Sequence, residues 1–525
     1  MRYFTIIGMF CALLGFSLVQ AQTDSGYIGR VDTIGGTTYD WQFDLSVRRR
    51  IVNSPDYGIH VIWLHSADTC PFYNVSGRYN FYDYSARSWN WIDPDFMQGG
   101  VNVFTDRCGY PGLDADPTTG IAVISCHTGF PIHPVVARDM APGGGVFEYC
   151  IGPEGYLWPV IAIGQGGLIH VGLIDDASRE GVCYSQIRTW CSWDSAVSIA
   201  VTFYPDHNIA SKVTQNVCLG WTDDSTVVFR ISTDGGTTWQ PAEWLSLPPA
   251  YSGDTVPVVF TWFPFYDHHN RLHILVDVMP YINGQGYIMP AEIWHWCPAN
   301  PDSWSRIHRA GCAPQNLRAP VGYNAIYACR SSIGEDDEGT LFVSWEQFDS
   351  SNVEPLTDLL RAGIWLASSQ DNGMTWNPVN RLTPLNAVSH RFPCIVDRMV
   401  AGAPDTVVVT YLMDPHAGFF VMGQGPADLC PIVCQFVPEN LLGVHEERGT
   451  QHVQRFMPSA TIVRGVLYIP DASGVGRSAL SVLLDITGRK VADLHRGVNN
   501  IRHLAPGVYF LQQGKNKTTK VVIQR

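Results

Sequence analysis

The chain has 525 residues, more than one ordinary domain needs, and a formal net charge of −14 at pH 7. The charge is uneven: residues 451–525 hold 11 Lys and Arg against 3 Asp and Glu, whereas residues 1–450 hold 23 against 45. This asymmetry indicates two modules, and the acidic balance of the larger one argues against nucleic acid as its partner, because phosphates would be repelled.

Residues 1–21 are typical of a secretory signal peptide. Arg2 precedes an apolar run from Phe4 to Leu18, and Val19 and Ala21 are the small or medium residues expected before a cleavage site. No later stretch offers about 18 consecutive apolar residues, so no transmembrane segment is predicted. We therefore expect an exported protein that is secreted or held at the cell surface.

Residues 22–440 have the pattern of an all-β array. Short runs rich in Val, Ile, Phe and Trp are separated by Gly, Pro, Asn and Asp, with almost no helical period. Apolar strands recur roughly 45–70 residues apart, as four-stranded propeller blades would. The recurring strands are residues 58–63, 120–127, 168–173, 217–221, 272–276, 341–345 and 407–412. They predict a β-propeller of seven blades, with six as the alternative, closed by pairing between residues 432–436 and 39–43.

The octapeptide S-x-D-x-G-x-T-W occurs twice within this array. The Asp can accept hydrogen bonds from nearby backbone N–H groups, the Gly can take a positive φ, and the Trp opens the next strand. The fixed positions are Ser232, Asp234, Gly236, Thr238 and Trp239 in one copy, and Ser369, Asp371, Gly373, Thr375 and Trp376 in the other. Each copy therefore predicts a turn between antiparallel strands.

This octapeptide resembles the Asp-box (BNR) repeat of sialidase-like β-propellers. In that family the boxes lie at the blade rims, away from the binding face. The resemblance therefore implies a fold and says little about a reaction. It also implies that the functional face lies at the other ends of the strands that flank residues 232–239 and 369–376.

Residues 441–454 lose the strand pattern and are predicted to be a linker, and residues 455–525 are predicted to form a small Ig-like β-sandwich. The tail resembles the type A C-terminal sorting domain of the type IX (Por) secretion system. The matching residues are Asp485, Gly488 and Arg489 of D-x-x-G-(R/K)-x-V, and Pro506, Gly507 and Tyr509 of L-x-P-G-x-Y. The resemblance implies recognition by outer-membrane secretion machinery. An ordinary Ig-like appendage is the alternative.

The sialidase resemblance also implies a residue set to look for. That family holds a substrate carboxylate with three arginines, because a guanidinium fork binds a carboxylate bidentately, and it adds a Tyr nucleophile, a Glu base and an Asp acid. The candidates here are Arg50, Arg107, Arg330 and Arg391 for the carboxylate, Glu346 as base, and Asp114 and Asp116 as acids. Arg50 lies in Arg50-Ile51-Val52, without the proline of the family's Arg-Ile-Pro motif. No Tyr–Glu pair is assigned, because the two need be neighbours only in space.

Other polar clusters have simpler structural interpretations. Residues 114–120 form a turn by composition, 335–339 a solvated hairpin loop with Ca²⁺ binding as an alternative, and 268–269 a loop tip. Cys430 and Cys434 lack the CxxC spacing of a zinc site. We therefore expect neither a metal nor a cofactor.

Thirteen cysteines follow residue 21, so at least one is unpaired within the chain. Export permits disulfides, and Cys183 and Cys191 flank a predicted hairpin that makes them candidates for a bridge. Cys126, Cys218 and Cys394 lie in strand-like runs and are expected to be buried free thiols.

Three hypotheses follow. The first is an exported bacterial β-propeller that binds a glycan or a protein through its central face without catalysis. The second is a sialidase-like glycoside hydrolase, and the third is a structural surface-layer component. Three arginines within reach of one carboxylate on the propeller axis, with a Tyr–Glu pair, would favour the second.

Overall fold

The structure is a computed structural model of the whole chain. It describes residues 26–44, 46–69, 72, 74–129, 131–177, 181–201, 206–401, 405–442, 461–463, 466–469, 481–485, 488–495, 497–513 and 517–523. The predicted signal peptide and most of the predicted linker lie outside these residues. The chain divides into two compact units, Met1–His445 and Glu446–Arg525. Within the described ranges, no helix is long and apolar enough to cross a membrane.

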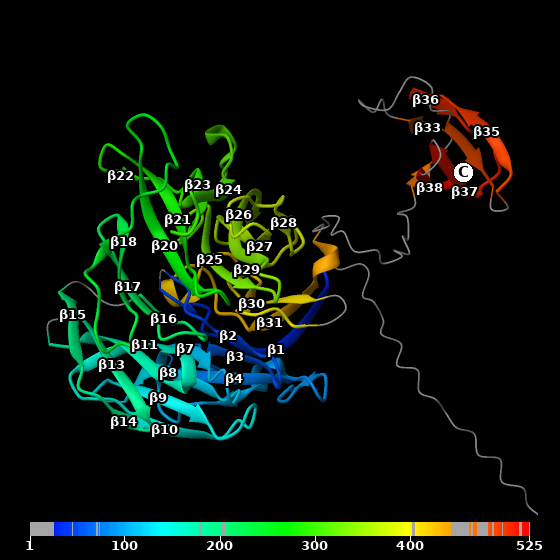
Figure 1. Cartoon of the computed structure of the whole chain (residues 1–525). Helices are drawn as coiled ribbons and strands as arrows, with labels where there is room; N and C mark the ends of the chain where they lie inside the picture. Colours follow the sequence, from blue (N-terminus) through cyan, green and yellow to red (C-terminus); the bar gives the residue numbers. More distant parts are fainter. Residues whose placement is uncertain are drawn as a thin grey trace, which may run out of the picture. The chain divides into compact units, whose positions relative to one another are not determined.

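The larger unit is a β-propeller made of antiparallel sheets around a common centre (Figure 1). Its described residues form seven sheets, each with a path of four strands. One blade per sheet would make seven blades. From the inner strand outward, the first two sheets contain β2 (Ile51–Ser54), β3 (Gly58–His65), β4 (Ser76–Asp83) and β5 (Ser88–Trp89), and then β7 (Cys108–Ala115), β8 (Ala122–Thr128), β9 (His133–Asp139) and β10 (Phe147–Ile151). The third, fourth and fifth sheets contain β11 (Tyr156–Ile163), β12 (Ile169–Asp175), β13 (Gly181–Thr189) and β14 (Ser192–Trp193); β16 (His207–Ala210), β17 (Val217–Asp223), β18 (Thr226–Ser232) and β19 (Glu243–Trp244); and β20 (Val256–Tyr266), β21 (Leu272–Ile282), β23 (Ala291–Trp296) and β24 (Trp304–Ala310). The last two sheets contain β25 (Ala328–Glu335), β26 (Leu341–Glu354), β27 (Leu359–Ser369) and β28 (Asn380–Arg381), and then β29 (Ser389–Ile395), β30 (Thr406–Asp414), β31 (Cys430–Pro438) and β1 (Arg30–Thr37).

Short elements complete the unit. β6 (Val101–Asn102), β15 (Val197–Val201) and β22 (Gln285–Gly286) pair with β4, β13 and β21. The described helices are single 3₁₀ turns, namely η1 (Phe96–Gln98), η2 (Gln165–Gly167), η3 (Pro314–Asn316), η4 (Phe420–Met422) and η5 (Glu439–Leu441). The inner strands from β2 to β29 contact one another in chain order, and Asn53 of β2 donates its N–H to Asp397, which follows β29. Each sheet thus buries its faces against its two neighbours in the ring.

Strands from both ends of the unit close the ring. β1 pairs antiparallel with β31, with Arg30 opposite Phe436 and Thr37 opposite Cys430. The sequence prediction that residues 39–43 make this pairing was wrong. β1 contains Gly35 and Gly36, where a Cβ would overlap Trp63 and Phe96, so its sequence lacks the apolar run that marks the other strands.

Bulges in the inner strands aim side chains across the centre. The backbone takes a positive φ at Tyr110 (48°), Trp158 (46°), Arg330 (58°) and Phe392 (55°), each at a register shift of its strand. Positive φ is uncommon for residues with a Cβ, and a bulge redirects the side chain that it carries. These bulges place Arg330 and Phe392 in the site described below.

The two octapeptides form identical turns, between β18 and β19 and between β27 and β28. Asp234 Oδ1 accepts the N–H of Thr238 at 2.8 Å, and its Oδ2 accepts the Thr238 hydroxyl at 2.6 Å. Asp371 and Thr375 repeat both bonds at the same distances. The predicted role of the octapeptide as a turn between antiparallel strands is thus visible in its hydrogen bonds.

Each octapeptide turn also packs on the third strand of the preceding sheet. Gly236 lies against Tyr184 of β13 and Gly373 against His295 of β23, so closely that a Cβ would overlap either side chain. Both partners are held by buried histidines, His170 Nδ1 at 2.6 Å from the Tyr184 hydroxyl and His273 Nδ1 at 2.8 Å from His295 Nε2. The turns therefore join neighbouring sheets as well as neighbouring strands.

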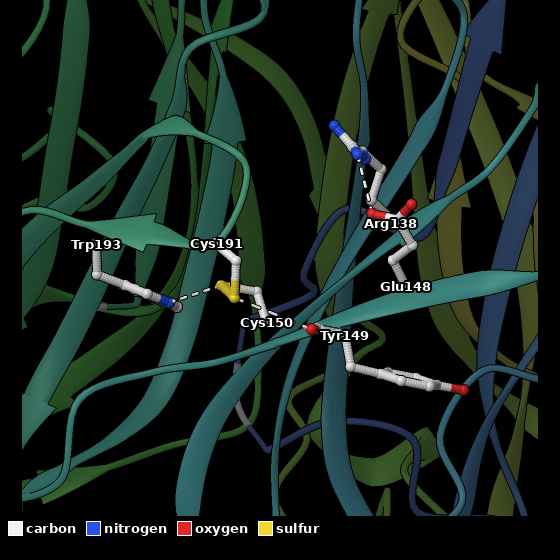
Figure 2. The surroundings of a disulfide bond; sticks show 6 residues. All are labelled: Arg138, Glu148, Tyr149, Cys150, Cys191 and Trp193. Carbon is white, nitrogen blue, oxygen red and sulfur yellow. Dashed lines mark hydrogen bonds and ion pairs between the residues drawn. A yellow bond between two sulfur atoms is a disulfide. The ribbon is translucent and has the colours of Figure 1, made fainter.

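A disulfide joins the outer parts of the second and third sheets in chain order (Figure 2). Cys150 of β10 is bonded to Cys191, which lies in the turn between β13 and β14, and their Cα atoms are 4.9 Å apart. The indole N–H of Trp193 donates to the sulfur of Cys150 at 3.0 Å. The bridge suggested from the sequence was wrong, because Cys183 is buried in the middle of β13 as a free thiol.

The smaller unit has two sheets on one apolar core. β32 (Thr461–Val463), β38 (Lys517–Ile523), β37 (Gly507–Gln513), β34 (Ser481–Leu484) and β35 (Lys490–Leu494) form one sheet, and β33 (Val466–Ile469) pairs with β36 (Gly497–Asn500). Leu467, Leu483 and Leu511 lie in the shared core. In the D-x-x-G-R element, Asp485 Oδ1 accepts the N–H of Arg489 at 3.0 Å, and the Tyr509 hydroxyl donates to the carbonyl of Ala505 at 2.9 Å. These residues therefore have structural roles as turn formers.

Candidate functional site

The octapeptide turns identify the two faces of the propeller. They connect third to fourth strands, so they lie at the same end of the sheets as the turns from first to second strands. The opposite end, which we call the distal face, carries the connections from second to third strands and from one sheet to the next. It includes residues 38–50, 245–255, 283–290, 311–327 and 415–429, apart from residue 45, which is outside the described part.

Three of the predicted site residues meet close to the axis. Glu346 of β26 accepts from Arg330 Nη1 at 2.5 Å, from Arg391 Nη2 at 3.1 Å and from Arg391 Nε at 3.2 Å. The N–H of Phe392 donates to the same carboxylate at 2.8 Å. Burial raises the pKa of Glu346, but the charges of Arg391 and Arg330 outweigh it and bring the pKa to about 2. Glu346 is therefore a permanent internal anion at neutral pH.

Arg50 joins the edge of this cluster. Its Nη1 is 3.5 Å from Gln42 Oε1, its Nη2 donates to the carbonyl of Phe392, and its guanidinium lies 4.7 Å from the centre of the Phe43 ring. Burial lowers the pKa of Arg50 to about 10, so the side chain remains charged at neutral pH. Three of the four candidate arginines and the candidate base therefore lie in one buried cluster.

An aromatic cap closes the cluster from solvent. The cap consists of Trp41, Phe43, Phe392 and Phe419, which are all buried. The Trp41 and Phe419 rings are 4.8 Å apart, and the guanidinium of Arg391 lies 4.3 Å from the Phe419 ring centre. Two of these residues come from the segment that follows β1, so the N-terminal strand both closes the ring and carries part of the cap.

The closed cluster differs from a carboxylate-binding site in one decisive respect. Glu346 already occupies Arg330 and Arg391, and the two guanidinium groups and the carboxylate are at most 1% exposed. Among the described residues, no tyrosine hydrogen-bonds to Glu346, whose polar partners are Arg330, Arg391, the Phe392 N–H and the Cys329 thiol. In this arrangement, Arg330 and Arg391 bind a carboxylate of the protein itself, where a substrate-binding site would hold the carboxylate of its substrate.

The remaining candidates lie elsewhere. Arg107 is exposed and its Nε is 3.4 Å from the carbonyl of Phe72. Asp114 is buried, where it accepts from Lys212 Nζ and from the Ile163 N–H, both at 2.7 Å. Asp116 accepts the N–H of Thr118 at 2.8 Å within a turn, as its composition predicted, but the predicted turn began too early, because Asp114 lies in β7.

The acidic run that begins at Glu335 is only partly the solvated hairpin loop that we expected, because Asp337 and Glu338 are exposed in the turn but the two residues before them are not. Glu335 and Asp336 are buried. Glu335 accepts from His268 Nδ1 at 2.7 Å and forms an ion pair with Arg398, and Asp336 accepts the N–H of Thr340 at 2.7 Å. The first two carboxylates thus hold neighbouring chain segments, because their side chains point into the protein where β25 ends.

An open groove lies on the same distal face, beside β20 and β21. It has a volume of about 440 Å³, and its lining includes Tyr251, Ser252, Tyr287, Met289 and Arg309. Tyr287 is 43% exposed, whereas the Tyr251 hydroxyl is fixed by the carbonyls of Val278 (3.1 Å) and Pro290 (2.7 Å). Sequence analysis missed this groove, because its walls come from two connections that only the fold brings together.

Comparisons with known proteins find similar solved structures at low sequence identity. No family model matches the chain, and no curated protein is detectably related to it. Similar solved structures include an ulvan lyase of polysaccharide lyase family PL25 (TM-score 0.40, 12% identity, 77% of this chain and 96% of that chain). They also include an α-L-arabinanase from Penicillium chrysogenum in complex with arabinobiose (0.39, 10%, 66% and 95%) and the NanB sialidase from Streptococcus pneumoniae (0.40, 8%, 78% and 71%). Similarities at this level do not assign a function.

Proposed function

We propose that this protein is an exported β-propeller that binds a glycan or a protein through its distal face, and that it does not act as a sialidase. The observation that carries the proposal is the placement of Glu346 between Arg330 and Arg391 beneath the aromatic cap. Arginines that are already hydrogen-bonded to a buried internal carboxylate are not available to hold the carboxylate of a sialoside.

The groove beside β20 and β21 is the binding site that we favour. Its volume of about 440 Å³ lies within the range of about 300–1,000 Å³ that small-ligand sites occupy. The exposed ring of Tyr287 offers an apolar surface that loses little conformational entropy on binding, and Ser252 and Arg309 add hydrogen-bonding groups. Sugar rings have apolar faces and hydroxyl rims, so a glycan is the first ligand to test. A protein ligand would have to cover about 800 Å², well beyond the groove.

Export is supported by three separate features. Residues 1–21 have the composition of a signal peptide, and the tail matches a bacterial sorting domain in six residues that include Asp485 and Tyr509. The Cys150–Cys191 disulfide is a bond that persists in oxidising compartments. Delivery by type IX secretion, with outer-membrane machinery as the partner of the tail, is the route that we propose.

A sialidase-like hydrolase is the second candidate, because three arginines and a glutamate do converge near the axis. For that function, the cap residues Trp41 and Phe419 would have to move and a substrate carboxylate would have to replace Glu346. Separating a buried carboxylate from its arginine partners costs about 3–5 kcal/mol, which the substrate would have to supply.

A glycan array probed with the full chain tests the proposal. We expect a defined set of glycans to be retained by the protein and by the Tyr281→Ala control, and lost with Tyr287→Ala. Tyr281 is 39% exposed on the same hairpin but does not line the groove, so it matches Tyr287 in chemistry and solvent contact. Equal glycan binding by both variants would contradict the groove as the binding site. If the unaltered chain binds no glycan, the proposed ligand of the distal face becomes a protein.

A further inference from the structure

A cluster of metal-ligating side chains lies at the base of the loop between β30 and β31. Asp414 is the last residue of β30, His416 follows two residues later, and Asp428 stands two residues before β31 begins. One ligand atom from each of these three residues lies within 4.8 Å of the other two. The two ends of a 15-residue loop are therefore drawn together by groups that can all bind one cation.

The cluster has more carboxylates than cationic partners, because Asp414 and Asp428 share one imidazole, that of His416, and Asp40 lies nearby. Asp414 is 4% exposed, so its carboxylate is largely removed from water. The nearest arginine, Arg391, is committed to Glu346 by two hydrogen bonds. Buried carboxylates are ordinarily paired with a cation or coordinate a metal, because an isolated buried charge is costly.

Asp414 has a free oxygen in this position. One oxygen, Oδ1, accepts the N–H of His416 at 2.8 Å, and its second oxygen has no hydrogen-bond donor among the described residues. His416 Nδ1 points to Asp428 Oδ2, to which it is hydrogen-bonded. The carboxylate of Asp40 accepts the N–H groups of Phe420 and Val421 instead, so it lies outside the set of three ligands and fixes the adjacent chain.

We propose that Asp414, His416 and Asp428 bind a divalent transition-metal ion, with Zn²⁺ as the expected metal. Zinc binds imidazole nitrogen and carboxylate oxygen at about 2.0–2.2 Å, which separates two ligands of one ion by roughly 3–4 Å. The three ligand atoms already lie within 4.8 Å of one another, close to that spacing. An imidazole in the set favours zinc over Ca²⁺, which takes six to eight oxygen ligands.

Two of the three proposed ligands reach the protein surface. The side chains of His416 and Asp428 are 27% and 26% exposed, so the ion can enter and exchange. A metal ligand must be a neutral imidazole nitrogen, so the ion takes the place of the hydrogen bond between His416 and Asp428. The ion would fix both ends of the loop that carries Phe419, and hence one side of the aromatic cap over Arg391.

Zinc titration of the metal-free full chain tests this site, with calorimetry as the first readout and the visible spectrum of bound Co²⁺ as the second. We expect one ion per chain. Loss of a residue that hydrogen-bonds to a metal ligand typically weakens metal binding 10–100-fold. His416→Ala and Asp428→Asn remove the ligands themselves, so each is expected to weaken zinc binding about 100-fold or more. His268→Ala is the matched control, because His268 is a partly exposed histidine hydrogen-bonded to a carboxylate on the opposite face.

The possible results of the titration either support or overturn the proposed zinc site. One equivalent of zinc bound by the unaltered chain and by His268→Ala, with loss in both site variants, supports the site. Absence of stoichiometric binding in the unaltered chain overturns it, as does equal binding by the site variants. If circular dichroism shows His416→Ala to be unfolded, the near-isosteric Asp428→Asn decides, and an unchanged Co²⁺ spectrum in that variant also overturns the proposal.

Discussion

Substitution of Glu346 by glutamine should destabilise the propeller strongly. The change keeps the size of the side chain and removes the charge that balances Arg330 and Arg391, all of which are buried. Lowering the pKa of Glu346 from 4.5 to about 2 corresponds to about 3 kcal/mol of stability at pH 7. Breaking a buried ion pair costs about 3–5 kcal/mol by a separate route. We therefore expect Glu346→Gln to lower the free energy of unfolding by about 3–5 kcal/mol.

Urea unfolding followed by tryptophan fluorescence measures this effect, because residues 451–525 contain no tryptophan and the signal reports the larger unit. The control is Asp349→Asn, which breaks a partly exposed pair whose Asp349 Oδ2 lies 3.0 Å from Arg381 Nη1, and which should cost less than about 1 kcal/mol. The folded pKa of Glu346 is depressed, so its contribution is complete above about pH 4.5 and is lost as the pH falls toward 2. A loss below 1 kcal/mol at pH 7, equal to that of the control, would refute the reasoning.

Three further predictions concern the joints between sheets. Gly373→Ala should lower the free energy of unfolding by about 2–4 kcal/mol, because the new Cβ would overlap the preceding sheet and the residue would also bear the strain of a positive φ. Gly253→Ala has the same strain but lies in open space, so it should cost only about 1–2 kcal/mol. Equal losses of unfolding free energy in urea would argue against a contact between sheets at Gly373. Burial lowers the pKa of His170 to about 3, so the neutral form of this histidine stabilises the fold above pH 6.5, and the contribution falls by about 1.4 kcal/mol for each pH unit below that. The free energy of unfolding of His170→Gln should therefore fall less steeply than that of the unaltered chain between pH 6.5 and 4.5. Parallel curves of unfolding free energy against pH would contradict this. Serine at both Cys150 and Cys191 should lower the free energy of unfolding by about 2–4 kcal/mol, and peptide mapping that links either cysteine to another partner would disprove the assigned bridge.

Local sequence signals predicted the turns well. The Ser, Asp, Gly and Thr of each octapeptide act within eight residues, so the string contains nearly everything that forms the turn, as Asp234 and Asp371 demonstrate with identical hydrogen bonds. What the string does not contain is the partner of its glycine. Tyr184 lies 52 positions before Gly236, and only the ring arrangement brings them together.

The candidate site was predicted only in part. The arginines and Glu346 could be proposed together because a family resemblance supplied the set, and the fold does bring Arg50, Arg330 and Arg391 together. The cap escaped prediction, because Trp41 contacts Phe392 and Phe419 across more than 300 residues. Trp41 and Phe43 were instead assigned to the closing strand, because an apolar run by itself does not distinguish an edge strand from a buried loop.

Fluorogenic sialoside turnover by the full chain tests the central claim most directly. The claim is that Glu346 and the aromatic cap close the arginine cluster to substrates. The account predicts no turnover above background for the unaltered chain at any pH between 5 and 8. Turnover that is retained by Asp349→Asn and abolished by Glu346→Gln, with both variants folded, would contradict it.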